Sequence, residues 1–235
     1  MAIPAIAPYP MPGPQELPAN RVTWTPDPQR ALLLIHDMQN YFVEAFPQNT
    51  APISDAIARI TELRETAWRL DVPVVYSAQP GGQTTSQRGL LQDFWGPGIG
   101  PGRHGQDIIP ALTPGPSDIR LVKWRYSAFH RTELRDILTK TGRDQLIVTG
   151  VYAHIGCLMT VCEAFMGDVQ AFLVSDAVAD FSAEHHRMAL KYAADRCATV
   201  LPALEIIEAL ARSDDSTPAS EGPTQDHEPI AIESP

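Results

Sequence analysis

The sequence predicts a three-layer α/β domain with a doubly wound, mostly parallel sheet of six strands. Six short apolar runs have the length of buried strands, and the segments between them carry apolar residues at helical spacing. Because the runs are apolar on both faces, they are typical of a parallel sheet that helices cover on both sides. Ligands bind to such sheets at the carboxyl ends of the strands.

The elements follow in order along the chain. The predicted strands are Ala31–Ile35, Val72–Tyr76, Ile119–Val122, Gln145–Val148, Val169–Val174 and Ala198–Leu201. After the first strand, helical spacing relates Ile57, Ile60, Leu63, Ala67 and Leu70. A second clear helix covers Glu184–Arg196, with its polar residues on the far side.

The 235 residues divide into one domain and two tails. Residues 1–28 hold eight of the 22 prolines and are expected to lie extended on the domain. The domain itself is predicted to span residues 29–212. Residues 213–235 are acidic and poor in large apolar groups, so we expect this tail to be disordered.

Charge and composition exclude several classes of function. The net charge is −10, and six acids in the tail leave −4 on the rest of the chain, so a nucleic-acid-binding face is not expected. No apolar run has the length of a membrane span, and the N-terminus lacks the charged start of a secretory signal. Three scattered cysteines favour a reducing compartment. We therefore expect a cytoplasmic protein.

Polar residues follow the strands at one edge of the predicted sheet. They are Asp37, Gln79, Lys123, the segment Gly150–Cys157 (GVYAHIGC), Asp176 and Asp180. An acid, an amide and an ammonium at one edge fit a small substrate with carboxylates, with Lys123 as the cation and Asp37 as a proton carrier. Taken singly, Asp37 could be a helix N-cap and Lys123 a surface charge.

The segment of residues 79–118 is long and contains nine of the 15 glycines. A structureless loop of this length is either functional or a sign that an element has been misassigned. Within it, Arg88–Trp95 (RGLLQDFW) is predicted to form a short helix that carries Arg88 and Trp95 toward the strand ends as a lid. The alternative is a surface loop that Trp95 anchors by packing.

Other signals do not predict a cofactor site. His185 and His186 are adjacent and point to different helix faces, so they cannot chelate together. His154, Cys157 and Cys162 lack a second ligand group at zinc-binding spacing. The glycines at positions 96–102 have no preceding strand and no following Lys-Ser/Thr pair. No metal and no organic cofactor is therefore expected.

The sequence resembles the isochorismatase family over residues 31–197. The resemblance is carried by the strings LLLIHDMQNYF, VVYSAQPGG, DFWGPG, VKWRYSAF, GRDQLIVTGVYAHIGCL, SDAVADFS and HHRMALKYAADRC. It implies the isochorismatase-like, or cysteine-hydrolase, fold. The match is most similar to the branch that hydrolyses vinyl ethers, which includes the hydrolase of 2-amino-2-deoxyisochorismate in phenazine pathways.

One departure from the wider family is informative. In the amidohydrolase relatives, a nucleophilic cysteine follows the fourth strand, at the position of Gly156 here; Cys157 comes one residue later and is turned away. This departure excludes amide hydrolysis through an acyl-enzyme. We also expect Gly156 to leave space for a substrate ring. The resemblance further implies a cis peptide bond between Val151 and Tyr152.

The resemblance implies hydrolysis of the enolpyruvyl vinyl ether of 2-amino-2-deoxyisochorismate, with isochorismate as the alternative substrate. Asp37 would be the general acid beside Lys123. Substrate-binding residues would be Gln79, Arg88, Trp95, Tyr152, Gly156 and Phe42. A homodimer is expected. A cysteine amidohydrolase and a non-catalytic family member remain as lower alternatives.

Overall fold

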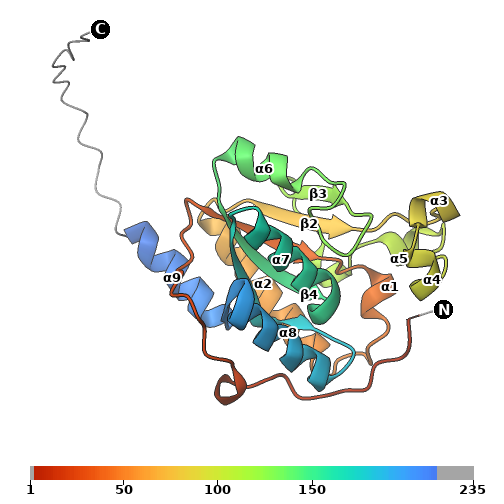
Figure 1. Ribbon diagram of the computed structural model, residues 1–235, viewed down its shortest axis with the longest axis horizontal. Helices are drawn as coiled ribbons and strands as arrows, with labels where there is room; N and C mark the ends of the chain where they lie inside the picture. The colour runs from red at the N-terminus through yellow and green to blue at the C-terminus, as the bar shows by residue number, and fades with distance from the viewer. Residues whose placement is uncertain (1–2, 216–235) are drawn as a thin grey trace, which may run out of the picture.

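The computed structural model describes residues 3–215 and contains one sheet in the order β3-β2-β1-β4-β5-β6. Every neighbouring pair of strands in this sheet is parallel, so the predicted doubly wound α/β fold is confirmed (Figure 1). The strands are β1 (Ala31–His36), β2 (Val74–Ala78), β3 (Ile119–Val122), β4 (Gln145–Val151), β5 (Gln170–Ala179) and β6 (Ala198–Leu201). The order reverses between β1 and β4, where doubly wound sheets open a crevice for ligands.

Four strands run past their predicted ends, and β4 and β5 do so by the most residues. The predicted fourth strand stops before Thr149, but this side chain is buried and donates to the Leu34 carbonyl oxygen at 3.0 Å. β5 continues likewise to Ala179, which places Asp176 inside the strand instead of after it. Asp176 Oδ1 accepts a hydrogen bond from the Ala203 backbone at 2.7 Å. Asp176 therefore caps the last helix and does not join the polar group expected at the sheet edge.

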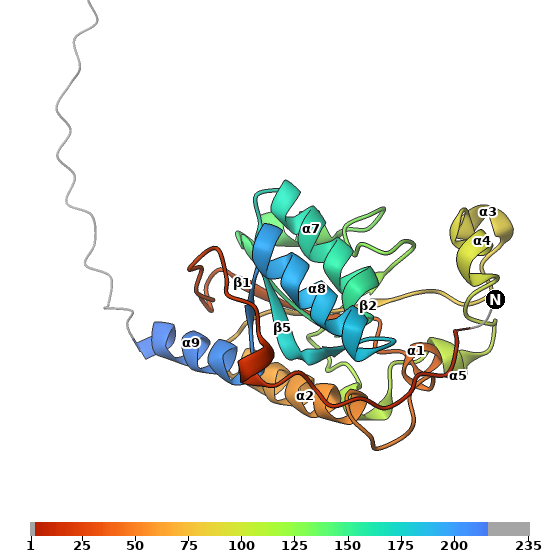
Figure 2. The same ribbon diagram turned by 60° about the horizontal axis from the view of Figure 1, so that its bottom comes forward.

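Helices cover both faces of the sheet (Figures 1 and 2). On β1, Ala31, Leu33 and Ile35 pack into one core, and Leu32 and Leu34 pack into the other. The first core includes residues of α2 (Ile53–Arg69) and α9 (Ala203–Asp215). The second includes residues of α6 (Leu134–Thr141), α7 (Leu158–Met166) and α8 (Ala183–Arg196). This alternation explains why the strands are apolar on both faces.

Short elements complete the sheet edge where the polar residues meet. They are α1 (Asn40–Val43), α3 (Thr85–Arg88), α4 (Leu91–Trp95), α5 (Arg103–Gln106), η2 (Pro110–Leu112) and η3 (Ala153–Cys157), the last a single π-helical turn. The single helix predicted over residues 88–95 is instead two helices, because Gly89 lies between them with φ of 57°. The segment of residues 79–118 is thus folded, and we call residues 85–95 within it the lid.

The N-terminal arm packs on its own domain. It is extended apart from the one-turn helix η1 (Pro14–Glu16), and Ile6 and Tyr9 are buried. The Ile6 backbone donates to the Ala45 carbonyl oxygen at 2.8 Å. In Figure 1 the N-terminal end of the arm lies near α4, at the side of the molecule that carries the lid.

The described part of the chain ends in helix α9. Helix α9 runs to Asp215, three residues beyond the predicted domain boundary, and the rest of the predicted acidic tail lies outside the described residues.

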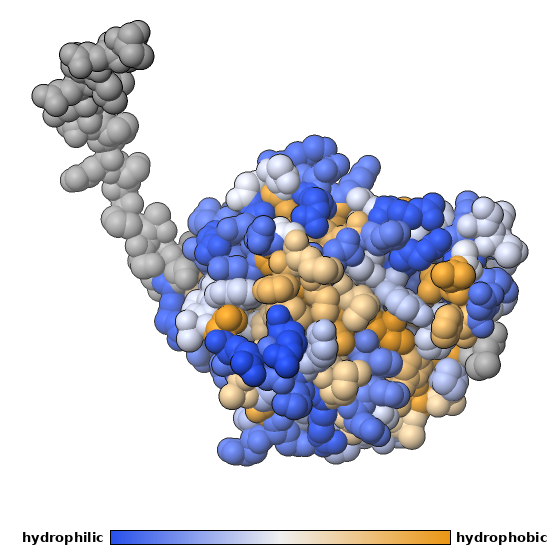
Figure 3. Space-filling view, in the orientation of Figure 1, coloured by the Kyte–Doolittle hydropathy of each residue, from blue (hydrophilic) through white to orange (hydrophobic). Residues whose placement is uncertain are grey.

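Exposed apolar side chains lie on α7 and α8, and Figure 3 shows hydrophobic surface across that face. Within residues 3–215, no helix has both the length and the apolar character that crossing a membrane requires. The expected homodimer stays a prediction.

Candidate active site

One pocket lies at the carboxyl ends of β1, β2 and β4. All eight predicted site residues line it, together with seven that the sequence analysis did not predict as site residues. The predicted residues are Asp37, Phe42, Gln79, Arg88, Trp95, Lys123, Tyr152 and Gly156; the others are Ile3, His36, Tyr41, Leu91, Tyr126, Val151 and Ile155. The structure thus brings the predicted residues together, and their individual roles stay predictions.

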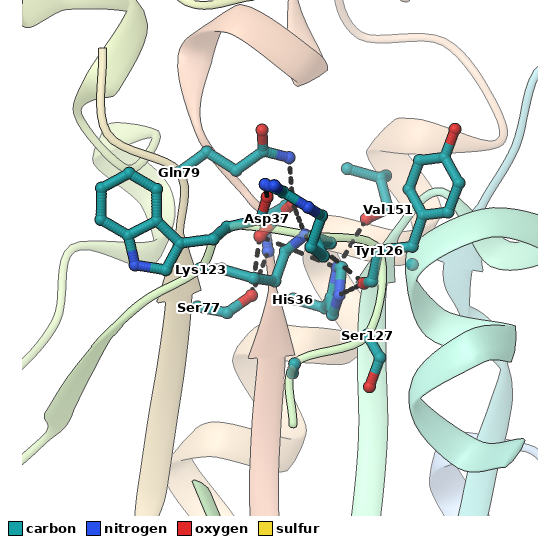
Figure 4. Close-up of polar contacts among 12 residues, drawn as sticks. His36, Asp37, Ser77, Gln79, Lys123, Tyr126, Ser127 and Val151 are labelled. Atoms are coloured by element: carbon teal, nitrogen blue, oxygen red, sulfur yellow. Dashed lines mark hydrogen bonds and ion pairs between the residues drawn. The ribbon is translucent and has the colours of Figure 1, made fainter. Parts of the chain in front are cut away.

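Asp37 is the centre of the polar network in Figure 4. It follows β1 with a positive φ of 51°, and its carboxylate is buried. Ser77 Oγ donates to Oδ1 at 2.7 Å, and Gln79 Nε2 donates to Oδ2 at 3.0 Å. The Lys123 ammonium lies 3.0 Å from the same Oδ2 atom. The carboxylate is therefore fixed from three directions, and the N-cap alternative is wrong, because Gln39 occupies the N-cap of α1.

The electrostatics of Asp37 reflect two opposing effects. Burial raises the pKa of its carboxyl, but the Lys123 ammonium and the hydrogen bonds from Ser77 and Gln79 lower it and outweigh burial. The pKa of Asp37 therefore lies below its ordinary value, and in the empty pocket Asp37 is a carboxylate at neutral pH.

Lys123 is only 1% exposed, so the alternative of a surface charge is wrong. Its backbone nitrogen donates to the Ala78 carbonyl oxygen at 2.9 Å, which continues the pairing between β2 and β3 past the strand ends. Its ammonium also donates to the carbonyl oxygens of Arg125 and Tyr126. A buried lysine with three oxygen partners supplies a fixed positive charge beside Asp37.

The lid delivers a second cation. Arg88 is 4% exposed; its Nε donates to the Gly96 carbonyl oxygen at 3.0 Å, and one terminal nitrogen donates to Gln79 Oε1 at 3.2 Å. Within residues 3–215, no carboxylate lies within ion-pair distance of Arg88. Gln79 thus connects the Arg88 guanidinium to the Asp37 carboxylate. An unpaired buried cation that lines a pocket is suited to bind an anion.

Aromatic side chains form the apolar wall of the pocket. The Tyr152 ring stacks on Phe181 with centroids 4.3 Å apart, and Trp95 stacks on the same ring at 6.0 Å. Tyr152 also donates its hydroxyl proton to the Phe42 carbonyl oxygen at 2.9 Å. The Trp95 indole donates to the Tyr126 hydroxyl at 2.7 Å, which fastens the lid. The Val151–Tyr152 peptide bond is cis, so this expectation is confirmed.

The surroundings of Gly156 correct one expectation. A β-carbon at this position would lie 2.1 Å from Cε1 of His36, so the space that a side chain would occupy holds the His36 ring. It is not open for a substrate ring. Cys157 does not line the pocket; its Sγ faces the Thr149 carbonyl oxygen at 3.9 Å, and burial raises the pKa of the thiol well above its ordinary value. No nucleophile therefore stands at this side of the pocket among the residues described.

A group of possible metal ligands lies outside the pocket. His154, Asp180 and His185 have ligand atoms within 4.8 Å of one another, whereas the pattern considered from the sequence was His154 with Cys157 and Cys162. The carboxylate of Asp180 already accepts hydrogen bonds from the His154 ring, the His154 backbone and the Phe181 backbone. The two histidine rings stack almost parallel, 4.3 Å apart. The Asp180 carboxylate and the His154 ring thus already have partners within the protein.

Comparisons with known proteins agree with this geometry. The model of the isochorismatase domain matches residues 31–204, from β1 to the start of α9. The chain belongs to the isochorismatase family. Solved structures extend the likeness to the fold: a cysteine hydrolase from Pseudomonas syringae aligns with a TM-score of 0.74 at 24% identity, over 83% of this chain and 98% of that one.

Three relatives align over most of this chain. An isochorismatase from Bacillus subtilis is 59% identical over 198 residues, which are 84% of this chain and 64% of that protein. The phenazine biosynthesis protein PhzD1 from Pseudomonas aeruginosa is 48% identical over 88% of this chain and 99% of its own length. Enterobactin synthase component B from Escherichia coli is also 48% identical, over 89% of this chain and 73% of that protein.

Proposed function

We propose that this protein hydrolyses the vinyl ether of an enolpyruvyl group carried by a small dicarboxylate ring. The observation that carries the proposal is Arg88, a buried guanidinium that lines the pocket without a carboxylate partner among the described residues. A substrate carboxylate would complete its pairing. The names of the relatives, an isochorismatase and a phenazine biosynthesis protein, support this class of substrate.

The first step is protonation of carbon. Asp37, in its acid form, gives its proton to the terminal methylene carbon of the enol ether, which leaves an oxocarbenium ion beside the Asp37 carboxylate. The pKa of Asp37 is below its ordinary value in the empty pocket. Two substrate carboxylates near Lys123 and Arg88 would offset the positive field that lowers it. Substrate binding thus creates the acid that the reaction uses.

The second step is addition of water. A water molecule attacks the oxocarbenium carbon and gives a proton to the Asp37 carboxylate, which restores the acid. The resulting hemiketal collapses into pyruvate and the ring alcohol, with the proton on the alcohol oxygen. In this scheme Gln79 keeps the carboxylate aligned, and the wall of Trp95 and Tyr152 limits water around the ring.

The charge of the pocket bears on the group at C2 of the substrate ring. Among the described residues that line it, Asp37 is the sole carboxylate, and it is already paired with Lys123. A neutral C2 hydroxyl therefore fits this lining better than a C2 ammonium, because no carboxylate of the lining is free to pair with an ammonium. On this ground we propose isochorismate as the better substrate, ahead of the 2-amino analogue that the sequence pattern favoured.

Pyruvate release from the two substrates tests the proposal. Both should be turned over because they share the vinyl ether and both carboxylates, and isochorismate should have the larger kcat/KM. A tenfold preference corresponds to about 1.4 kcal/mol in transition-state binding. Mass spectrometry of the ring product identifies the bond that breaks. Absence of pyruvate from both substrates would overturn the proposed function, and a tenfold preference for the amine would move the substrate assignment to the 2-amino compound.

A further inference from the structure

The ring of His36 and the backbone of Gly156 share one space. His36 is the last residue of β1 and directly precedes Asp37. A β-carbon placed on Gly156 would lie 2.1 Å from Cε1, 2.8 Å from Nε2 and 3.0 Å from Nδ1 of the ring. Contacts under 3.0 Å do not persist between real β-carbons and their neighbours, so one of the two groups would have to move. The imidazole therefore fits here only because residue 156 has no side chain.

The ring is fixed on both sides. Nδ1 lies 2.9 Å from the Val151 carbonyl oxygen, and Nε2 lies 3.3 Å from the Tyr126 carbonyl oxygen. The side chain is 1% exposed. Moving it aside would break the shorter of these contacts and leave a buried polar group without a partner, which is costly. The ring is thus not the free end of a flexible side chain.

The position of the ring also bears on the catalytic pair. The Lys123 ammonium and the His36 Nε2 atom approach the same Tyr126 carbonyl oxygen, at 3.4 and 3.3 Å. On its other side, the ring has Nδ1 3.9 Å from Asp37 Oδ1. The ring therefore packs against the Tyr126 carbonyl oxygen that helps to hold Lys123 beside Asp37, and displacement of the ring would remove this support.

The charge of the ring is consistent with a supporting role. Burial lowers the pKa of His36. This effect outweighs Asp37 and the nearby carbonyl oxygens, which raise the pKa. A neutral ring donates one hydrogen bond, and the shorter contact, from Nδ1 to the Val151 oxygen, is the one that it makes. The Tyr126 oxygen then meets Nε2 as a packing contact. The Asp37 carboxylate then keeps Lys123 as its single fixed cation at this side of the pocket.

We infer that His36 is a positioning and specificity-determining residue: its ring fills the space of a side chain at position 156, bars a nucleophile from that side of the pocket and holds Lys123 against Asp37. The inference rests on the proposed function, because it assigns this pocket to acid chemistry on a vinyl ether. Covalent catalysis would need a nucleophilic side chain within reach of the substrate. At position 156 no such side chain fits while His36 keeps its place.

A double-mutant cycle tests the shared space, with Gly156→Ala, His36→Ala and the double variant compared with the wild type. Gly156→Ala should lower kcat on the order of 100-fold, because the added methyl displaces the ring and Lys123. It should also lower Tm by roughly 3 to 10 °C through overpacking. In the His36→Ala background, the same substitution should change kcat by less than about threefold and should not lower Tm, since the two positions are coupled only through the ring.

A conservative variant separates positioning from packing. In His36→Asn, the amide nitrogen stands two bonds from Cβ, as Nδ1 does in histidine, and can still donate to the Val151 oxygen. We expect this variant to keep more kcat than His36→Ala. In both variants, the Kd for a saturated ether analogue of the substrate should rise by a smaller factor than kcat falls, because Arg88 does not depend on His36 and still meets a substrate carboxylate.

The outcomes are distinguishable from failure of the proposed function. If the wild type releases no pyruvate, the proposed reaction is wrong, and the Tm values of the four proteins still report whether His36 and Gly156 share one space. Equal effects of Gly156→Ala on Tm and kcat in both backgrounds would overturn the inference. So would equal kcat values for the asparagine and alanine variants of His36, because the positioning hydrogen bond would then carry no effect.

Discussion

The Lys123 ammonium lies 3.0 Å from the Asp37 carboxylate, and both side chains are almost completely withdrawn from solvent. This contact stabilises the charged form of a residue whose proposed task needs its protonated form. The pairing is therefore a resting state, and substrate must change the charge around it before carbon can be protonated.

Asp37→Asn should lower kcat by roughly 10²- to 10⁴-fold, because an amide cannot deliver the proton. The Kd of the saturated ether analogue should not increase, since the substituted group does not hold the carboxylates and the variant has no proton to take up. Asp176→Asn is the matched control: its carboxylate caps Ala203 outside the pocket, and an amide oxygen can still accept that hydrogen bond. More than about a tenth of wild-type kcat in the Asp37 variant would exclude Asp37 as the acid.

Substrate binding should take up protons. Because the pKa of Asp37 is lowered in the empty pocket, Asp37 is deprotonated at a pH above that value. A bound dicarboxylate raises the pKa again, so protons enter at any pH between the two values. Calorimetry of the saturated analogue in buffers of different ionisation enthalpy measures this uptake, and Asp37→Asn should abolish it. Equal heats in all buffers with the wild type would contradict substrate-coupled acid formation.

The pH dependence of kcat/KM follows from the same shift. In the free enzyme, the protonated fraction of Asp37 falls tenfold for each pH unit above the pKa of this residue. The logarithm of kcat/KM should therefore fall with rising pH, with a slope approaching −1. A profile that rises through the neutral range would point to a base in place of the acid.

Arg88→Ala should weaken binding of the substrate by about 2 to 4 kcal/mol, because a substrate carboxylate would lose a charged partner in a site with little water. The effect should appear in KM and in the Kd of the analogue. Arg103→Ala removes the same charge from the exposed helix α5, which does not line the pocket, and should leave both constants unchanged. An unchanged KM for the Arg88 variant would place the carboxylates elsewhere.

Cys157→Ala should keep kcat within about threefold of wild type. Its thiol faces the Thr149 carbonyl oxygen, away from the pocket lining, and its raised pKa keeps it protonated. Circular dichroism confirms that the variant is folded. Loss of activity in a folded variant would restore the cysteine-hydrolase alternative.

Tyr9→Phe should lower the free energy of unfolding by about 1 to 3 kcal/mol. The Tyr9 hydroxyl accepts from the Asp180 backbone at 2.8 Å and donates to His186 Nδ1, so phenylalanine would leave two buried groups without partners. The same substitution at Tyr192, which is exposed on α8, is the control and should have little effect. Urea unfolding with equal m-values gives both differences.

The sequence predicts much of this site because a parallel sheet gathers the residues that follow its strands. Asp37, Gln79 and Lys123 each come after a strand, so their meeting could be expected from the order of the elements. Ser77 and His36 were missed because both lie inside strands, where a polar residue gives no sign of the partner that it contacts. Ser77 gave one usable signal, a hydroxyl in an otherwise apolar run.

The rest depends on contacts that no local pattern encodes. His36 and Gly156 are 120 positions apart, and only the pairing of β1 with β4 brings them together. Tyr126 lies in a loop whose path depends on the packing of the whole lid, since its hydroxyl meets Trp95 and its carbonyl meets Lys123. The absence of a nucleophile at position 156 could be predicted from the sequence. That the His36 ring fills the space of a side chain there could not.

Ile3 belongs to the N-terminal arm and yet lines the pocket. A segment fused ahead of Met1 is therefore attached only two residues from the pocket lining. A purification tag there would compete with substrate for access and distort KM, whereas α9 lies at the opposite end of the molecule from the lid (Figure 1). Kinetic work on this enzyme is best done with the affinity tag placed after α9, so that the measured constants belong to the pocket and not to the tag.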